Sequence, residues 1–100
     1  MASRVAVDLY KTATICRKHR ISKLALFGSV LRDDFGPESD VDVLVEFEAG
    51  HVPGFFGLHR IACELATLFG GRNVDLLTFR SLNPLLRDRI LAEAEVQYAA

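Results

Sequence analysis

Three short apolar segments alternate with longer amphipathic ones, and this alternation limits the fold more than any other feature of the sequence. Apolar runs of about four to eight residues without a helical period are typical of buried strands, whereas apolar residues three or four apart are typical of helices. The pattern predicts an α/β fold in which a small mixed β-sheet is flanked by helices. The expected strands are residues 23–28, 40–47 and 73–79, and the expected helices are residues 3–20, 29–33, 55–69 and a last segment from 81–84 to 98.

Each of the three longer helices is expected to place one apolar face against the sheet. Both cysteines fall on such faces, so packing in the core explains them better than catalysis or metal binding. The apolar positions are Val5, Leu9, Ala13 and Cys16 in the first helix, Phe55, Leu58, Ala62, Leu65 and Phe69 in the second, and Leu86, Ile90, Ala94 and Tyr98 in the last.

The length and composition predict one globular domain spanning residues 1–100. The formal net charge is −1, so stable binding of nucleic acid, which usually needs a basic stripe, is not expected. No segment approaches the roughly 18–20 apolar residues of a membrane span, and no secretory signal is visible, so a cytoplasmic location is expected. The mean hydropathy of +0.20 suggests an apolar face for a partner, in a homo- or hetero-oligomer, although a tight core explains it equally well.

The strongest chemical signal is a pair of aspartates at the start of the second expected strand. Side chains two residues apart on a strand share a face, so Asp40 and Asp42 project together. If the second and third strands lie side by side with their apolar sets matched, Asp75 falls on that face and three carboxylates converge. Because like charges repel at short distance, a cation is expected between them. Hard oxygen ligands suit Mg²⁺ or Mn²⁺, which stabilise the oxygens in nucleotidyl transfer.

A phosphate-binding turn is expected where the first strand ends. Gly28 allows the backbone to approach a ligand closely, and Ser29 offers a hydroxyl and an amide at the start of the following turn. A helix N-terminus there would attract an anion, and Arg32 would lie on the same face as Ser29 with a guanidinium suited to phosphate oxygens. These residues predict a seat for a nucleoside triphosphate whose metal ions lie on the aspartates.

Taken singly, each of these signals has an ordinary structural explanation. A Gly-Ser pair is usually only a turn, an Asp-x-Asp pair is often a solvated strand end, and Arg72 is explained as well by a surface role as by contact with a triphosphate. The combination is more specific, because the glycine, serine, arginine and acids occur in one order around apolar strands.

The segment GSVLRDDFGPESDVDVLVEF resembles the signature of the polymerase-beta-type nucleotidyltransferases, which combines Gly-Ser, a nearby Arg and Ser-Asp-x-Asp. The short length and the ending PLLRDRILAEAEVQYA resemble the minimal nucleotidyltransferases, the MNT group, and the resemblance covers nearly the whole chain. It implies the polymerase-beta-like fold and an ATP substrate, with divalent metal ions on Asp40 and Asp42 and phosphate contacts from Gly28 and Ser29. A third acid on a neighbouring strand, here Asp75, would complete the metal site and act as the base.

The same resemblance implies a partner. Members of the MNT group commonly pair, as antitoxins, with small helical HEPN ribonuclease toxins, and some transfer AMP from ATP to a tyrosine of the toxin. Many relatives have Arg-Gly where this chain has Arg32-Asp33, and a negative charge at Asp33 close to the phosphates would weaken nucleotide binding. Larger relatives bind the acceptor with a second domain, so a partner protein or a second copy is expected to supply the acceptor site.

The leading hypothesis is therefore a metal-dependent protein adenylyltransferase that modifies a HEPN toxin and acts as a type VII-like antitoxin. A second hypothesis is a non-catalytic antitoxin that neutralises its toxin by contact alone. A third is a small-molecule nucleotidyltransferase, which the lack of an acceptor domain makes the weakest of the three. The sequence leaves open the base preference, the acceptor atom, the number of AMP units transferred and the oligomeric state.

Overall fold

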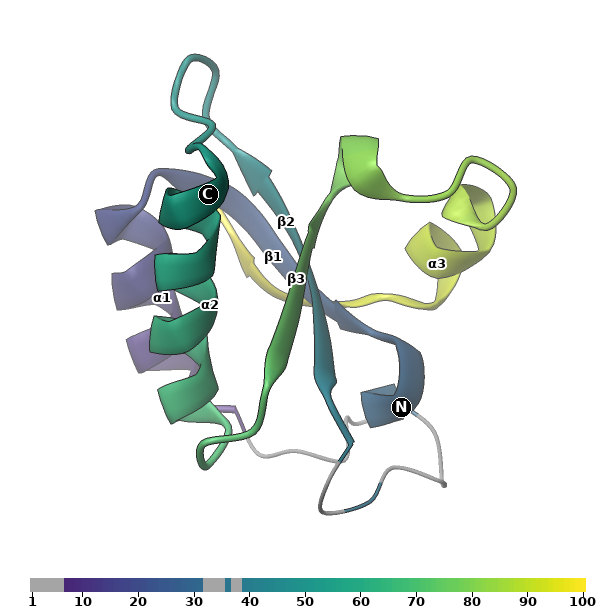
Figure 1. Cartoon of the computed structure of the whole chain (residues 1–100), viewed down its shortest axis with the longest axis horizontal. Coiled ribbons are helices and arrows are strands. Elements are labelled where there is room, and N and C mark those ends of the chain that lie inside the picture. The colour runs from purple at the N-terminus through teal and green to yellow at the C-terminus, as the bar shows by residue number, and fades with distance from the viewer. Residues whose placement is uncertain (1–6, 32–35, 37–38) are drawn as a thin grey trace.

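The computed structural model describes residues 7–31, 36 and 39–100, apart from the side chain of Ser29. This part of the chain forms a four-stranded sheet with helices on both sides, and none of its helices is long and apolar enough to cross a membrane (Figure 1). In chain order its elements are α1 (Leu9–Lys18), β1 (Ile21–Phe27), the 3-10 helix η1 (Gly28–Leu31), β2 (Val41–Phe47), α2 (Phe55–Leu68), β3 (Val74–Thr78), the 3-10 helix η2 (Phe79–Ser81), α3 (Arg87–Glu93) and β4 (Glu95–Ala99).

The sheet is mixed and has the strand order β3-β2-β1-β4. β1 pairs antiparallel with both β2 and β4, whereas β2 and β3 are parallel and are joined through α2. The crossover through α2 is needed because a tight turn cannot join parallel neighbours. This architecture confirms the α/β fold with a small mixed sheet, and the three expected strands lie within two residues of their observed bounds.

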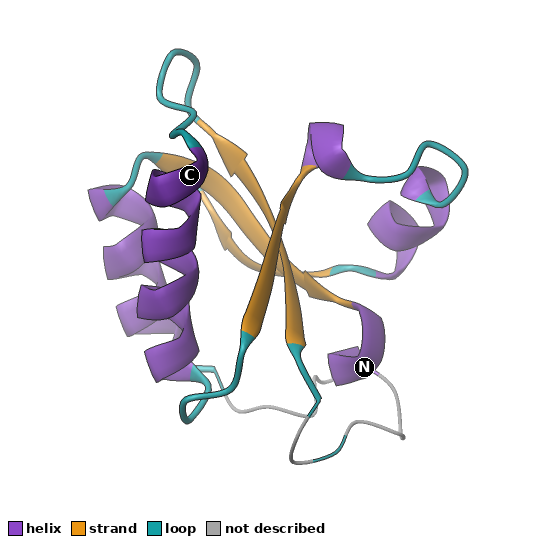
Figure 2. Cartoon of the chain, in the orientation of Figure 1, coloured by secondary structure: helices purple, strands orange, loops and turns teal. Residues whose placement is uncertain are grey.

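The helices divide between the two faces of the sheet (Figure 2). α1 and α2 cover one face, here called the α1–α2 face, and α3 lies over the other, the α3 face. The α3 face carries a small buried cluster of Phe27, Leu44 and Leu82, here called the α3-side cluster. The larger core lies on the α1–α2 face, and its buried members are Cys16, Ile21, Leu24, Leu26, Val30, Val41, Val43, Val45, Ile61, Leu65 and Phe69.

α1 begins at Leu9 because Asp8 caps it: the carboxylate accepts a hydrogen bond from the backbone N–H of Lys11 at 3.0 Å. The expected start at position 3 lies outside the described residues, and the expected end at position 20 is two residues too late. The expected apolar face is wrong at Leu9, which is 58% exposed. Thr12 is buried instead, because its hydroxyl donates to the carbonyl oxygen of Asp8 at 2.8 Å and so loses no hydrogen bond.

α2 is present as expected, but its buried face is turned relative to the expected one. Leu65 is buried as predicted, whereas Phe55 is 79% exposed and Ile61 takes a core position. Apolar residues surround much of this helix, so spacing alone did not select the correct face. The two cysteines differ in the same way: Cys16 is buried in the core, but Cys63 is exposed on α2.

The expected last helix, continuing to position 98, is wrong over its second half. α3 ends at Glu93, and the chain then turns into β4. Tyr98 is therefore not on a helix face with Leu86; it pairs with Leu24 of β1 and packs against the larger core. β4 forms because the outer edge of β1 would otherwise present unpaired backbone groups next to the core.

Candidate active site

The end of β1 and the start of β2 meet at a glycine. Gly28 has a φ of 74°, a conformation that favours glycine. A Cβ built on Gly28 would overlap Oδ2 of Asp42 and lie 3.2 Å from its Cγ. The missing side chain therefore makes room for the Asp42 carboxylate against the turn. The sequence suggested that Gly28 allows close approach of a ligand, and it did not reveal this second role.

Asp42 and Asp75 occupy matching positions on neighbouring strands. In the parallel ladder of β2 and β3, Asp42 pairs with Asp75, and Leu44 pairs with Leu77. Paired residues of neighbouring strands point to the same face, and such strands lie about 4.8 Å apart. Because Leu44 and Leu77 pack at the α3-side cluster, that face is the α3 face. The register thus places Asp75 on the same face as Asp42, where the sequence pattern predicted it.

Asp40 does not join this pair. It lies just before β2 and is exposed, whereas Asp42 is half-buried. The ladder begins one residue later, where the backbone N–H of Val41 donates to the carbonyl oxygen of Asn73 at 2.9 Å. Among the residues that the structure describes, no three side chains of His, Cys, Asp or Glu are gathered closely enough to hold a metal ion. In this structure the three acids are thus not gathered into one cluster: Asp42 and Asp75 occupy paired positions, and Asp40 lies just before the ladder, so its metal-binding role stays a prediction.

The paired acids nevertheless suit a magnesium ion. In nucleotide sites Mg²⁺ is usually held by one or two carboxylates and by the substrate phosphates, and not by a cage of protein ligands. Asp42 and Asp75 supply two hard carboxylate groups on one face, beside the turn at Gly28. Carboxylate oxygens favour Mg²⁺ or Mn²⁺ over softer metals. The donor set thus fits a metal ion whose remaining ligands come from a nucleotide.

The turn after β1 is helical, as expected, from Gly28 to Leu31, and the described residues form the 3-10 helix η1. The expected end of this helix at position 33 lies outside the described residues. Backbone N–H groups at the start of such a turn can contribute to anion binding. The side chain of Ser29 and the whole of Arg32 and Asp33 lie outside the described residues, so their expected roles toward the phosphates stay predictions.

Arg72 holds the segment before Asp40 in place through hydrogen bonds. Its Nη1 donates to the carbonyl oxygens of Gly36, at 2.6 Å, and Ser39, at 3.4 Å. The hydroxyl of Ser39 accepts a hydrogen bond from the backbone N–H of Gly36 at 3.0 Å. Because Arg72 lies just before β3, it ties the approach to β2 to the neighbouring strand. These contacts favour a structural role for Arg72 over the alternative contact with a triphosphate.

α3 forms the far wall of the space in front of Asp42. Gly28 and Asp42 line a hollow of about 280 Å³ whose opposite wall includes Arg89 and Glu93 of α3. Nε of Arg89 lies 3.4 Å from Oε1 of Glu93. The sequence does not reveal this wall, because an arginine and a glutamate four residues apart on a helix are typical of an ordinary surface ion pair.

A second hollow, of about 510 Å³, is lined by Asp40 and Asp75 together. Its other wall is α2, where Nε2 of His59 lies 3.7 Å from Sγ of Cys63. The expected core position of Cys63 is wrong, because its side chain is exposed on α2. Asp75 therefore lies on the α3 face together with Asp42 and also borders a hollow at the β3 edge of the sheet.

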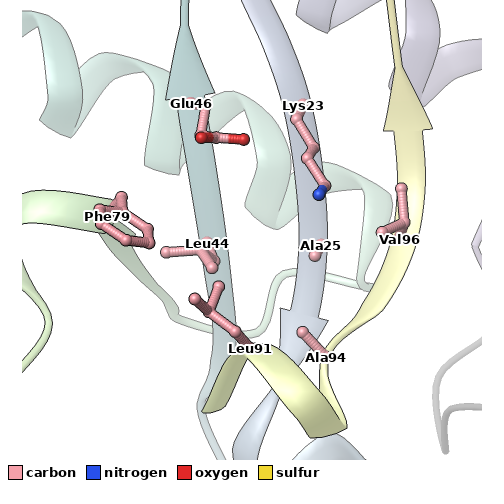
Figure 3. A pocket seen from close by; sticks show the side chains of 8 residues that line it. All are labelled: Lys23, Ala25, Leu44, Glu46, Phe79, Leu91, Ala94 and Val96. Carbon is pink, nitrogen blue, oxygen red and sulfur yellow. The ribbon is translucent and has the colours of Figure 1, made fainter. Parts of the chain in front are cut away.

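A third hollow, of about 200 Å³, lies beneath α3 but away from the acids (Figure 3). Lys23 and Glu46, which are paired positions on β1 and β2, lie at one end of it, and its other side chains are apolar. Leu44 lies on the same face between Asp42 and Glu46 and belongs to the α3-side cluster. This buried cluster separates the hollow from Asp42, so we do not assign the hollow to the candidate site.

Comparisons with known proteins identify the family and the fold of the chain. A family model described as the nucleotidyltransferase domain matches residues 9–96. A Methanocaldococcus jannaschii protein named "putative protein adenylyltransferase" is 42% identical over 84 residues, which cover 84% of this chain and 87% of the relative. The solved structure of a "putative minimal nucleotidyltransferase" has 35% identity and a TM-score of 0.69, covering 86% of this chain and 85% of that chain. A chain from the complex of a tri-AMPylated Shewanella oneidensis HEPN toxin with an MNT antitoxin shares the fold, with 20% identity and a TM-score of 0.64, covering 92% of this chain and 70% of that chain.

Proposed function

The chain belongs to the nucleotidyltransferase domain family, and from this membership we propose that it transfers AMP from ATP to a hydroxyl group of a partner protein. The observation that carries the proposal is the pairing of Asp42 with Asp75 beside the turn at Gly28. In the reaction the hydroxyl oxygen bonds to the α-phosphorus of ATP, the bond to the β-phosphate oxygen breaks, and pyrophosphate leaves. Such transfer depends mainly on positioning and on neutralising charge.

In this proposal Asp42 and Asp75 hold Mg²⁺ or Mn²⁺, and Asp40 is a further ligand. A divalent ion would neutralise the phosphate charge and stabilise the leaving pyrophosphate. Gly28 contributes by leaving space for the Asp42 carboxylate against the turn. The predicted phosphate contacts of Ser29 and Arg32 would hold the nucleotide at the same edge of the sheet.

Asp75 is also the proposed base for the acceptor hydroxyl. It is exposed on β3, which lies at the edge of the sheet, and it borders the hollow that contains Asp40. An acceptor that approaches from this edge reaches Asp75 without displacing α3. A carboxylate in that position can accept the hydroxyl proton while the new P–O bond forms.

The acceptor that we propose is a side chain of a HEPN toxin, so that the chain acts as its antitoxin. Two of the similar proteins support this choice: one is named a protein adenylyltransferase, and the other comes from a complex of an AMPylated HEPN toxin with an MNT antitoxin. Tyrosine is the first acceptor to test, because the resemblance to the MNT group implies it. In this proposal the toxin supplies the acceptor site.

The test is transfer of label from ATP labelled at the α-phosphate, in the presence of Mg²⁺ and a HEPN toxin that forms a complex with this chain. We expect label to enter the toxin, and we expect Asp42→Asn and Asp75→Asn each to reduce the rate at least about 100-fold. Glu46→Gln is the matched control, since it removes a carboxylate of β2 that lines the separate hollow of Figure 3. Failure of the native chain to transfer label, or undiminished transfer by both aspartate variants, would exclude the proposal.

A second candidate function, neutralisation by contact alone, is supported by exposed aromatic side chains. Phe55 and Phe56 are 79% and 83% exposed, and their rings pack edge to face with centroids 5.7 Å apart. Exposed aromatic side chains of this kind are enriched in protein interfaces. An Asp42→Asn/Asp75→Asn double variant that still neutralises the toxin in cells would favour this candidate. Loss of neutralisation by a double variant that still forms the complex would exclude it.

A further inference from the structure

The hollow in front of Asp42 has one positively charged side chain on its wall. Its lining residues are Phe27, Gly28, Asp42, Leu86, Arg89, Ile90 and Glu93, and within the described part of the chain Arg89 is the one cation among them. We propose that Arg89 binds the phosphate groups of the nucleotide from the α3 side of this hollow. The assignment rests on the function proposed above. It extends the predicted phosphate-binding site from the turn at Gly28 to α3.

α3 is attached to the fold by other residues, which leaves Arg89 available for this role. Ile90 packs against the α3-side cluster. Arg87 is used for attachment: its Nη2 donates to the carbonyl oxygen of Leu82 at 3.5 Å, and its Cζ lies 4.8 Å from the centre of the Phe79 ring. The two arginines of α3 therefore have different tasks, since Arg87 holds the helix and Arg89 lines the hollow.

Arg89 is held only weakly in its present position. Its partner Glu93 is four residues later, the Nε–Oε1 distance is 3.4 Å, and the two side chains are 74% and 62% exposed. Exposed pairs contribute little to stability, and the order arginine before glutamate is the weaker one on a helix because it places the negative charge near the C-terminus. Arg89 can therefore exchange Glu93 for a phosphate, whose oxygens match the two-pronged guanidinium.

The negative charges around the hollow also favour a positively charged side chain on this wall. Asp42 and Glu93 both line it, and a triphosphate would add further negative charge. A metal ion on Asp42 would neutralise one side of the nucleotide, and Arg89 would neutralise the side that faces α3. Glu93 competes with the phosphates for Arg89, so removing its charge should strengthen nucleotide binding while removing the charge of Arg89 weakens it.

The experiment titrates the full chain with adenosine, ADP and ATP in Mg²⁺ buffer and follows binding by NMR. We expect Arg89→Gln to weaken ATP binding about 10-fold and ADP binding less, and to leave adenosine binding unchanged, because only the phosphates meet the guanidinium. Arg60→Gln is the matched control: it removes the same charge from an exposed position of α2 that lines none of the hollows described above. We expect Arg60→Gln to bind all three ligands with native affinity.

Two further variants separate phosphate binding from a structural role. Arg89→Lys should retain part of the ATP affinity, and Glu93→Gln should tighten ATP binding about 2- to 3-fold. If the ion pair had a merely structural role, Arg89→Gln and Glu93→Gln would break it equally and would weaken ATP binding alike. Native ATP affinity in Arg89→Gln, or equal losses for adenosine and ATP, would refute the assignment and leave the proposed function intact. A native chain that binds no ATP would refute both.

Discussion

The two faces of the sheet differ in how completely they are buried. The more buried face contributes most of the stability, and the less buried face carries the candidate active site. On the α1–α2 face, α1 and α2, of 10 and 14 residues, cover a continuous core in which Leu26 and Leu65 are fully buried. On the α3 face, a helix of 7 residues covers a small cluster and leaves hollows beside it.

β2 shows how one strand serves both faces. Val41, Val43 and Val45 point into the larger core, while Asp42 and Leu44 point to the α3 face. Changes on the two faces should therefore have different consequences. Substitutions on the α1–α2 face should lower stability, whereas polar substitutions at the acids should affect activity with little effect on stability.

The largest expected effect is on the α1–α2 face. Leu65→Ala should lower the free energy of unfolding by about 2–5 kcal/mol, because it removes a fully buried side chain from a tightly packed core. Leu82→Ala on the α3 face should cost less, near the lower end of that range, because the smaller cluster can relax toward the neighbouring hollows. Urea denaturation measures both values. A greater loss for Leu82→Ala would contradict the comparison.

The second prediction concerns the pH dependence of the larger core. Burial raises the pKa of the Cys16 thiol to about 11, and the nearby Arg17 opposes this shift. Because the unfolded chain releases this proton near pH 9.0, the contribution is complete below pH 9 and is lost as the pH rises toward 11. The free energy of unfolding should fall by up to about 3 kcal/mol across that range. Cys16→Ala should lack this component; an unchanged pH profile in that variant would contradict the assignment.

The third prediction tests the junction at Gly28. Gly28→Ala should cost about 1–2 kcal/mol, because its φ of 74° disfavours a side chain, and it should also abolish AMP transfer by displacing Asp42. Gly50→Ala is the matched control, since Gly50 has a φ of 78° and open space around it. We expect Gly50→Ala to lose stability but to keep transfer activity. Thermal melting and the labelled-ATP assay separate the two effects, and equal activities in the two variants would exclude the role given to Gly28.

The smallest expected effect on stability is at Asp75. Because this side chain is exposed, Asp75→Asn should change the free energy of unfolding by less than about 0.5 kcal/mol. The same substitution should remove at least about 99% of the transfer activity if Asp75 is the base. Urea denaturation beside the transfer assay provides the check. A large loss of stability would indicate that Asp75 serves the fold and not the reaction.

Local patterns in the sequence determined β1, β2 and β3 and the side of each strand on which the acids lie. Alternation is a property of any extended chain, so Asp42 and Leu44 share a face wherever β2 is placed. Gly28 was recognisable for a related reason, since a glycine directly after an apolar strand predicts a sharp turn. The pattern failed for Phe55, because the apolar residues of α2 surround much of the helix and only packing selects the buried ones.

Only the tertiary structure decided the register of the acids and the fate of the C-terminal segment. The pairing of Asp42 with Asp75 depends on the register between β2 and β3. The backbone hydrogen bonds that join the two strands are the same for every residue type, so they do not encode this register in the sequence. The spacing from Leu86 to Tyr98 suits a helix, yet Tyr98 lies in a strand because the edge of β1 needs hydrogen-bond partners. That return to the sheet ends α3 at Glu93 and leaves it over the α3 face, where Arg89 lines the same hollow as Asp42.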